Sequence, residues 1–518
     1  MQKNTVWAVL AASLFLLVWY GWIMPPQKQV PAPAAVAQRA TDIQLNPVES
    51  TLKPTTEKNE NFVAEQEAII ETNTYRAVFT NRGAGIKHWF LKEKNGVLTD
   101  LVLPESSPCL ATFPGSNYLI SRPATNKIVF THTSPLGWRI IKTFDLSNDY
   151  LHTITIDTAK INSSAALPVI ELNWGPGLGT DLKEEKENYS LTRAIGFPRA
   201  KPLKLESFKA GEYYSAAGLR WAAVDNRYFL AALIFDETSP FTTVSAYREN
   251  KKMPFGIVVS SPKPGDTSSQ KYAVQVYLGP KGHTHLKSLG LKLEESVDFG
   301  FFGFLGKATL SVLLYLYSVT HNYGWAIIIL TIILQILVLP LTMKSFKASA
   351  HMKKLQPLMK QIQDKFKNDP KRLQAEMMNI YKVHKFNPMS GCLPMLLQLP
   401  IFWALFTTLR NAIELRNAPW ILWVTDLSAP EVLMTVAGYP IHLLPLIMGI
   451  GMFFQQKMMS ATSDPMQAKI MYFMPVMFIF MFWGFPAGLV LYWLTNSIVT
   501  MIEQMIIMKQ DTGGVVNG

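Results

Sequence analysis

Uncharged polar side chains recur inside the apolar segments of the C-terminal half, where each is costly unless it finds a hydrogen-bond partner. They are Thr331, Gln335, Gln398, Gln455, Gln456, Tyr492, Thr495, Asn496 and Thr500, with Glu503 nearer the end of the last segment. Thr331 and Gln335 are four residues apart, so they share one face of a helix. Hydroxyl and carboxamide groups donate and accept hydrogen bonds. The set therefore predicts either pairing between helices or the lining of a shared, hydrated groove.

No pattern typical of catalysis accompanies these side chains. The apolar half has no nucleophile–base pair, zinc signature, paired carboxylates or phosphate-binding loop. Cys109 and Cys392 lie in segments of different character, without a partner at metal-ligand spacing. We therefore expect a protein that is not an enzyme, with no metal and no other cofactor. Nothing in the sequence indicates a DNA partner.

Long apolar segments must position the polar residues. The chain has 518 residues, 49% of them apolar, and a formal net charge of +12. Since a bilayer core needs about 20 consecutive apolar residues, we predict membrane spans at about 323–342, 391–410, 437–456, 467–484 and 486–508. Residues 299–321 are richer in aromatic and polar side chains. They favour an amphipathic helix at the membrane interface over a further span.

The N-terminal segment also predicts a span. Residues 1–24 contain an apolar run from Trp7 to Ile23, and Pro25 and Pro26 end the helix. An uncleaved anchor is favoured over a cleaved signal peptide, because the small-residue site Ala35–Ala37 lies well beyond the apolar run. Residues 25–60 are proline-rich without apolar periodicity, which predicts a linker.

The segment from 61 to 290 predicts an all-β domain. Short alternating or β-branched runs, separated by turn residues, indicate a β-sandwich. The runs are Tyr75–Thr80, Lys127–Thr133, Trp138–Phe144, Leu151–Asp157, Phe241–Tyr247, Phe255–Ser260 and Tyr272–Leu278.

A basic segment between the second and third spans fixes the orientation. Residues 343–387 contain eleven Lys and Arg residues, among them Lys353 and Lys354, against three acidic ones. Because lysine and arginine are retained on the cytoplasmic side, this segment is predicted to be cytoplasmic. Counting spans then places both termini and the 509–518 tail in the cytoplasm. The β-domain lies on the opposite side.

The same basic segment predicts a helical hairpin. Leu355, Leu358, Met359, Ile362 and Phe366 form one apolar stripe, and Leu373, Met377, Ile380, Tyr381 and His384 form another. Asp369 suits an N-cap and Pro370 the first helical position. The hairpin either fixes topology alone or binds a partner, for which Met378 is a candidate contact.

Five stretches resemble the bacterial YidC membrane protein insertases, in the form with a large periplasmic domain. They are Asn387–Phe406, Glu414–Ser428, Met452–Met458, Asp464–Phe478 and Phe485–Thr495. The β-rich domain matches more loosely, mainly through the Asn81–Gly85 turn and Tyr272–Pro280.

The resemblance implies a polytopic α-helical core of five helices beside the N-terminal anchor, a periplasmic β-super-sandwich, and residence in the bacterial inner membrane. It implies insertion and chaperoning of nascent membrane proteins through a groove open to cytoplasm and lipid, alone or with the Sec translocon. The ribosome is a further implied partner. Thr331, Gln335, Tyr492 and Trp493 would line the groove. The family typically has arginine at the position of Gln335 and often a second tyrosine at that of Trp493.

Two other classes of protein stay open at this point. A solute transporter or channel would show internal repeats or a ring of ionisable residues, and the sequence contains neither. A passive assembly scaffold would act on membrane proteins only after their insertion.

Overall fold

The computed structural model describes residues 65–513, except for 94, 104–105, 180–191, 199–201, 206–212, 236–240, 242, 249–253, 368, 385–392 and 460–464. The anchor predicted at 1–24 and the linker predicted at 25–60 lie outside the described residues. So does Cys392.

The first part of the described chain is a β-domain that ends in two short helices. Its strands are β1 (Glu67–Glu71), β2 (Tyr75–Thr80), β3 (Gly85–Lys92), β4 (Leu98–Asp100), β5 (Leu119–Ala124), β6 (Lys127–Thr133), β7 (Trp138–Asp145), β8 (Leu151–Lys160), β9 (Glu171–Trp174), β10 (Arg193–Phe197), β11 (Leu203–Lys204), β12 (Tyr213–Ala217), β13 (Trp221–Asp225), β14 (Phe229–Ile234), β15 (Thr243–Tyr247), β16 (Gly256–Ser260) and β17 (Ser269–Pro280). The helices are α3 (His283–Ser288) and the 3-10 turn η2 (Leu293–Ser296).

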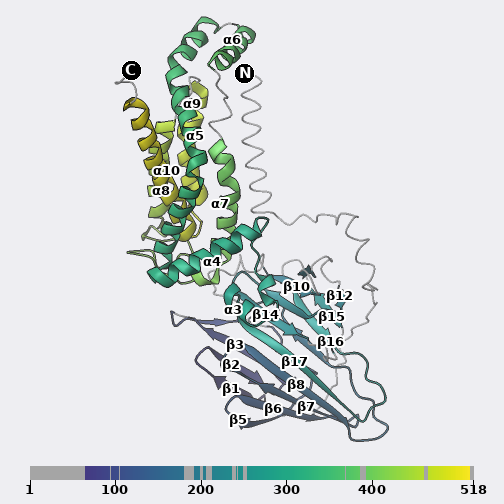
Figure 1. Ribbon diagram of the computed structural model, residues 1–518. Helices are drawn as coiled ribbons and strands as arrows, with labels where there is room; N and C mark the ends of the chain where they lie inside the picture. The colour runs from purple at the N-terminus through teal and green to yellow at the C-terminus, as the bar shows by residue number, and fades with distance from the viewer. Residues whose placement is uncertain are drawn as a thin grey trace. The chain divides into compact units, whose positions relative to one another are not determined.

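These strands form one large and two small antiparallel sheets (Figure 1). The large sheet has nine strands in the order β11-β10-β13-β14-β17-β8-β7-β6-β5. The small sheets have the orders β1-β2-β3-β4 and β12-β15-β16-β9. One hydrophobic core joins all three. Phe79 of a small sheet, for example, packs 4.9 Å from Phe144 of the large one, between ring centroids. The predicted β-sandwich architecture is confirmed.

Sheet packing explains which strands the sequence revealed. Side chains in β6, β7 and β8 alternate between buried and less buried positions, as expected where only one face is covered. All five residues of β13 and all six of β14 are buried. These central strands therefore lack the alternation on which the sequence prediction relied.

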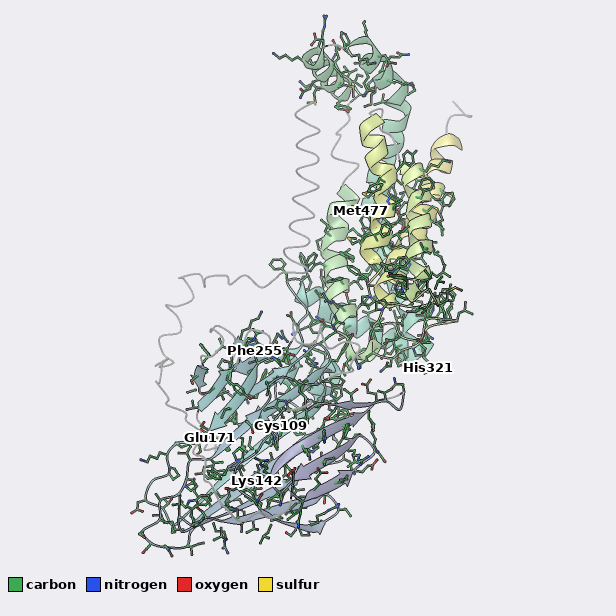
Figure 2. All side chains as sticks on the ribbon, turned by 180° about the vertical axis from the view of Figure 1, so that it is seen from behind. Cys109, Lys142, Glu171, Phe255, His321 and Met477 are labelled. Carbon is green, nitrogen blue, oxygen red and sulfur yellow. The ribbon has the colours of Figure 1, made fainter. Side chains whose placement is uncertain are left out.

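The core of the β-domain contains Cys109 and, less expectedly, a lysine (Figure 2). Lys142 is fully buried and donates hydrogen bonds to Thr112 Oγ1 at 2.9 Å and to the carbonyl oxygen of Leu110. Burial lowers the pKa of Lys142 well below the usual lysine value, because a low-dielectric interior disfavours the charged amine. Burial likewise raises the pKa of the Cys109 thiol to about 12, which leaves it unreactive.

A buried carboxylate ties the end of the large sheet to the segment that follows it. Asp225 is fully buried and binds both Arg193 and Lys281, whose Nζ lies 2.7 Å from Asp225 Oδ2. Arg193 also donates to the carbonyl oxygen of Ser296, at the end of η2. The group therefore holds β10, β13, β17 and η2 together.

Because of the ion pairs of Asp225, the stability of the β-domain depends on pH in the acid range. Burial alone would raise the pKa of Asp225, but Arg193 and Lys281 outweigh it and hold that pKa below the usual 3.8. The stability that the Asp225 carboxylate contributes is thus fully present above about pH 3.8. It is lost as the pH falls through the lower pKa that Asp225 has in the folded protein. We expect the unfolding temperature of the full chain in detergent to drop steeply below pH 4. In Asp225→Asn this drop should be smaller. An equal drop in both proteins would contradict the assignment.

The C-terminal part is helical, with one small hairpin. Its elements are α4 (Gly303–Thr320), α5 (Tyr323–Lys365), α6 (Pro370–Val383), α7 (Leu393–Asn411), the 3-10 turn η4 (Ile413–Leu415), β18 (Met434–Val436), β19 (Tyr439–Ile441), α8 (Leu443–Met459), α9 (Pro465–Phe482) and α10 (Ala487–Gly513). Helices α5 and α7 to α10 match the five predicted spans in order, and α10 packs against α5, α7 and α8.

The second span and the first hairpin helix are one continuous helix. α5 runs for 43 residues, so no break occurs at the predicted boundary near 343. Asp369 caps α6 by accepting a hydrogen bond from the Arg372 amide at 3.1 Å, and Pro370 begins that helix. The two stripes meet where Leu355, Met359 and Ile380 are buried together, flanked by Met377 and Tyr381.

The predicted span at 437–456 begins too early. Residues 437–441 belong to the β18–β19 hairpin, with the positive-φ residues Ala437 and Gly438 at its turn, and α8 begins only at Leu443. Glu431 marks this start, because its Oε1 accepts a hydrogen bond from the Leu444 amide at 2.7 Å. That amide is one of the donors a helix start leaves unpaired. The hairpin is apolar, so hydropathy alone extended the span into it.

Helix α4 confirms that residues 303–320 are helical. By length and composition three helices among the described residues can cross a membrane: Gly303–Thr320, Tyr323–Met343 and Ala487–Ile507. In Figure 1, α4 runs crosswise to α5 and α10. The interfacial position of α4 stays a prediction.

Candidate functional site

Six polar side chains from α5, α7 and α10 meet inside the helical part. This polar cluster consists of Thr331, Gln335, Gln398, Tyr492, Asn496 and Thr500. All but Thr500 line one narrow cavity, together with the apolar residues Leu334, Val338 and Ile401. Spacing on each helix explains the convergence, since Tyr492, Asn496 and Thr500 follow one another at intervals of four residues along α10.

Hydrogen bonds join three helices within the polar cluster. Gln335 Nε2 donates to Asn496 Oδ1 and, at 3.3 Å, to Thr500 Oγ1. Gln398 Nε2 donates to Tyr492 Oη at 2.8 Å and to Asn496 Oδ1 at 3.1 Å. Asn496 is therefore the shared acceptor of α5 and α7. Thr331 instead donates to the Ile327 carbonyl in its own helix, at 2.7 Å.

The polar cluster carries no charge. Its members are uncharged, and every other residue that lines the cavity is apolar. Thr331, Gln335 and Tyr492 are each at most 5% exposed. Such a site offers hydrogen bonds in apolar surroundings, where an unpaired polar group is costly. It holds neither a general acid–base pair nor a set of metal ligands. No group of three potential metal-binding side chains occurs among the described residues.

Local sequence features fix the helices that carry the polar cluster. Asn322 caps α5, because its Oδ1 accepts hydrogen bonds from the amides of Gly324 and Trp325. Gly324 itself leaves room for Trp420, since an added Cβ would lie 2.0 Å from the indole ring. Both contacts set where α5 begins and hence the height of Gln335 along it.

Not every predicted site residue belongs to the polar cluster. Trp493 packs against Phe402, Phe478 and Phe482, with ring centroids 5.0 to 5.6 Å apart, and does not line the cavity. Gln456 lies on α8, likewise outside the residues that line the cavity. Adjacent residues on a helix point in different directions, so Trp493 points away from the cavity that Tyr492 lines.

Sequence reasoning missed one polar residue on this side of α10. Gln504 is 5% exposed, and neither atom of its carboxamide has a hydrogen-bond partner. Its signal was available, because it continues the four-residue spacing of Tyr492, Asn496 and Thr500.

The predicted hairpin residues divide into packed and exposed ones. Met377 packs against the small core of the α5–α6 hairpin, whereas Met378 is 50% exposed. Lys353 and Lys354 lie on α5, in the part that forms the hairpin. The side chains of Lys353 and Lys354 are not among those that the structure describes.

Comparison with known proteins gives concordant matches. The family "60Kd inner membrane protein" matches residues 315–513, and "YidC periplasmic domain" matches residues 112–311. "Membrane protein insertase YidC" of Endomicrobium trichonymphae is 50% identical over 99% of each chain. The protein of that name from Geotalea daltonii is 37% identical over 98% of this chain and 99% of its own. A solved structure, "Active YidC insertase crystal structure with the first transmembrane domain resolved", covers 85% of this chain and 92% of its own, at 19% identity and TM-score 0.40. This chain belongs to the YidC family of membrane protein insertases.

Proposed function

We propose that this protein inserts proteins into the membrane by giving their polar segments a temporary hydrogen-bonding site, the polar cluster. The observation that carries the proposal is that Gln335, Gln398 and Asn496, from three helices, are joined by hydrogen bonds. A polar segment that crosses lipid loses its water, and that loss is the main barrier to its movement. Side chains that donate and accept hydrogen bonds partway across lower this barrier. No covalent step is involved, so the protein acts as a chaperone and not as an enzyme.

The charge of the α5–α6 hairpin sets the orientation in this proposal. Lys360, Lys365, Lys367, Lys371 and Arg372 lie in or beside it, and such residues are retained in the cytoplasm. The hairpin, both termini and the ends of α5 and α10 beyond the polar cluster are then cytoplasmic. The β-domain is periplasmic. Substrates approach the polar cluster from the hairpin side and leave sideways into lipid, alone or beside the Sec translocon, with the ribosome as a further partner.

The hairpin receives substrate before the polar cluster does. Its exposed apolar side chains include Met378, Leu358 and Val383, and its sequence is rich in lysine. Methionine adapts to differently shaped apolar partners. A mixed apolar and basic surface suits nascent segments of varied sequence.

A photo-crosslinker at Met378 should capture a stalled nascent membrane protein. Its partly exposed position leaves the probe free to reach a substrate without disturbing the hairpin core. Crosslinked products on ribosome-bound chains, resolved by gel, are the measurement. Leu119, which is 74% exposed in the β-domain, is the matched control and should give none. Crosslinks from Gln335 without any from Met378 would leave the hairpin with a role in topology alone.

Purified protein in liposomes tests the proposed function itself. It should convert a small double-spanning substrate to a protease-protected form, while empty liposomes should not. Solute flux through the protein without insertion would instead support a transporter.

A further inference from the structure

One ionisable side chain lies on the groove side of α10, beyond the polar cluster. Glu503 follows Thr500 by three residues and Asn496 by seven, so it lies on the same side of the helix. At a rise of about 1.5 Å per residue, it is about 10 Å further along α10 than Asn496. It is about 24 Å from the helix start, which is less than the thickness of a hydrocarbon layer, about 30 Å.

The neighbours of Glu503 confirm that it is turned away from lipid. Ile502, Met505 and Ile506 are 45% to 54% exposed and form the outer, apolar face of α10. Glu503 is only partly buried, whereas Gln504 beside it is 5% exposed. Around Glu503, helix α10 thus has an outer apolar face and an inner polar face.

Both inner side chains have buried polar atoms without a hydrogen-bond partner. Glu503 Oε2 is buried without a hydrogen bond, and so are both carboxamide atoms of Gln504. Within the part of the chain that the structure describes, no ion pair joins Glu503 to a cation. An ionisable group at membrane depth is costly and usually has a charged partner. No such partner occurs among the side chains that the structure describes.

The chemistry of that partner follows from the charges nearby. The polar cluster is uncharged, so the carboxylate of Glu503 is the only formal charge that the described groove face of α10 contributes. A carboxylate binds ammonium and guanidinium groups through charge-assisted hydrogen bonds. The adjacent carboxamide can accept a further donor from the same group.

We propose that Glu503 and Gln504 bind the lysine or arginine that flanks an inserting segment, and so hold that end of the segment on the hairpin side. This inference rests on the proposed insertase function and assigns the groove a selectivity for cationic flanks. Apolar residues of the substrate pass the uncharged cluster and enter lipid. The cationic flank stays at Glu503, which makes this pair a determinant of substrate orientation.

The test compares flanks and variants in one insertion assay. A single-span substrate carries Lys, Gln or Glu beside its apolar segment, and the liposomes contain phosphatidylcholine and phosphatidylglycerol only. The wild-type protein should insert the Lys form in the correct orientation roughly fivefold more than the Glu form, as one partly solvated ion pair allows. Glu503→Gln should remove most of this preference, and Glu503→Asp should retain it. Met505→Leu, on the lipid face, should match the wild type.

The neutral substrate separates the possible failures. Its insertion should be equal in all variants, which shows that they fold. If no substrate inserts in the wild type, the proposed function fails. If all insert but Glu503→Gln keeps the full Lys preference, the Glu503 assignment fails while the function stands. A lipid amine is the other source of an ammonium group. The same assay is therefore repeated in liposomes that also contain phosphatidylethanolamine. An effect of Glu503→Gln that appears only in these liposomes and is independent of the flank would assign the site to lipid and overturn the substrate proposal.

Discussion

Gln335→Leu should reduce insertion of a small double-spanning substrate by about tenfold, the effect of losing one to two net hydrogen bonds in apolar surroundings. Leucine fills similar space but removes the Nε2 donor that reaches Asn496 and Thr500. The polar cluster then loses its connection to α5, and the substrate loses a polar side chain near the middle of its path. Protease protection in liposomes measures the result.

The charge at this position separates two mechanisms. The resemblance to the family leads one to expect arginine, but the glutamine here makes the same kind of contact without a charge. If hydrogen bonding drives insertion, Gln335→Arg should be tolerated, because guanidinium also donates to Asn496. Ile336→Leu, at a position 59% exposed on the outer face of α5, is the matched control. Normal insertion by Gln335→Leu would falsify the role of groove polarity.

Asp225→Ala should destabilise the β-domain by about 3–5 kcal/mol, because it leaves two cations without their buried partner. Lys281 is 4% exposed at its side chain and Arg193 21%, so water compensates only in part. For a domain of this size the unfolding temperature should fall by roughly 10 °C. Thermal unfolding of the full chain in detergent, followed by limited proteolysis of the β-domain, provides the measurement.

Two variants make this result specific. Asp266→Ala removes a carboxylate that pairs with Lys160 but is 97% exposed, and it should leave the unfolding temperature unchanged. Adding Lys281→Met to Asp225→Ala should restore part of the lost stability, since it removes one unpaired buried charge. A loss in Asp266→Ala equal to that in Asp225→Ala would show that the group around Asp225 has no special weight.

Periodicity predicted much of the fold, and its failures have identifiable causes. All seven predicted segments contain a strand, and β6, β7 and β8 among them alternate clearly in burial. The strands β13 and β14 escaped detection since both of their faces are buried. Hydropathy placed five helices in the right order but could not distinguish the apolar β18–β19 hairpin from the start of a span. Asp369 and Asn322 cap their helices through hydrogen bonds to amides that are close in the sequence. The cap at Asp369 was predicted, because Pro370 follows it.

The candidate site was predictable as a set of residues and not as a geometry. The costliness of polar groups in lipid singled out Gln335, Gln398 and Asn496, and their side chains do meet. Sequence spacing within one helix cannot specify which helices adjoin it, so the shared acceptor role of Asn496 required the structure. The position of Trp493 among aromatic side chains could not be predicted for the same reason, since adjacent residues on a helix face different neighbours.

The continuous helix α5 joins the polar cluster to the hairpin. At 43 residues it is a rod of about 64 Å, with Gln335 in its first half and the hairpin residues Leu355 and Met359 in its second. A load placed on the hairpin is transmitted along one backbone, without an intervening loop to absorb it. We expect bending to concentrate at Pro340 and Pro357, the two prolines inside the helix, because each lacks an amide donor. We therefore expect a tilt of the hairpin to reach the polar cluster through α5, with Pro340 between the two regions.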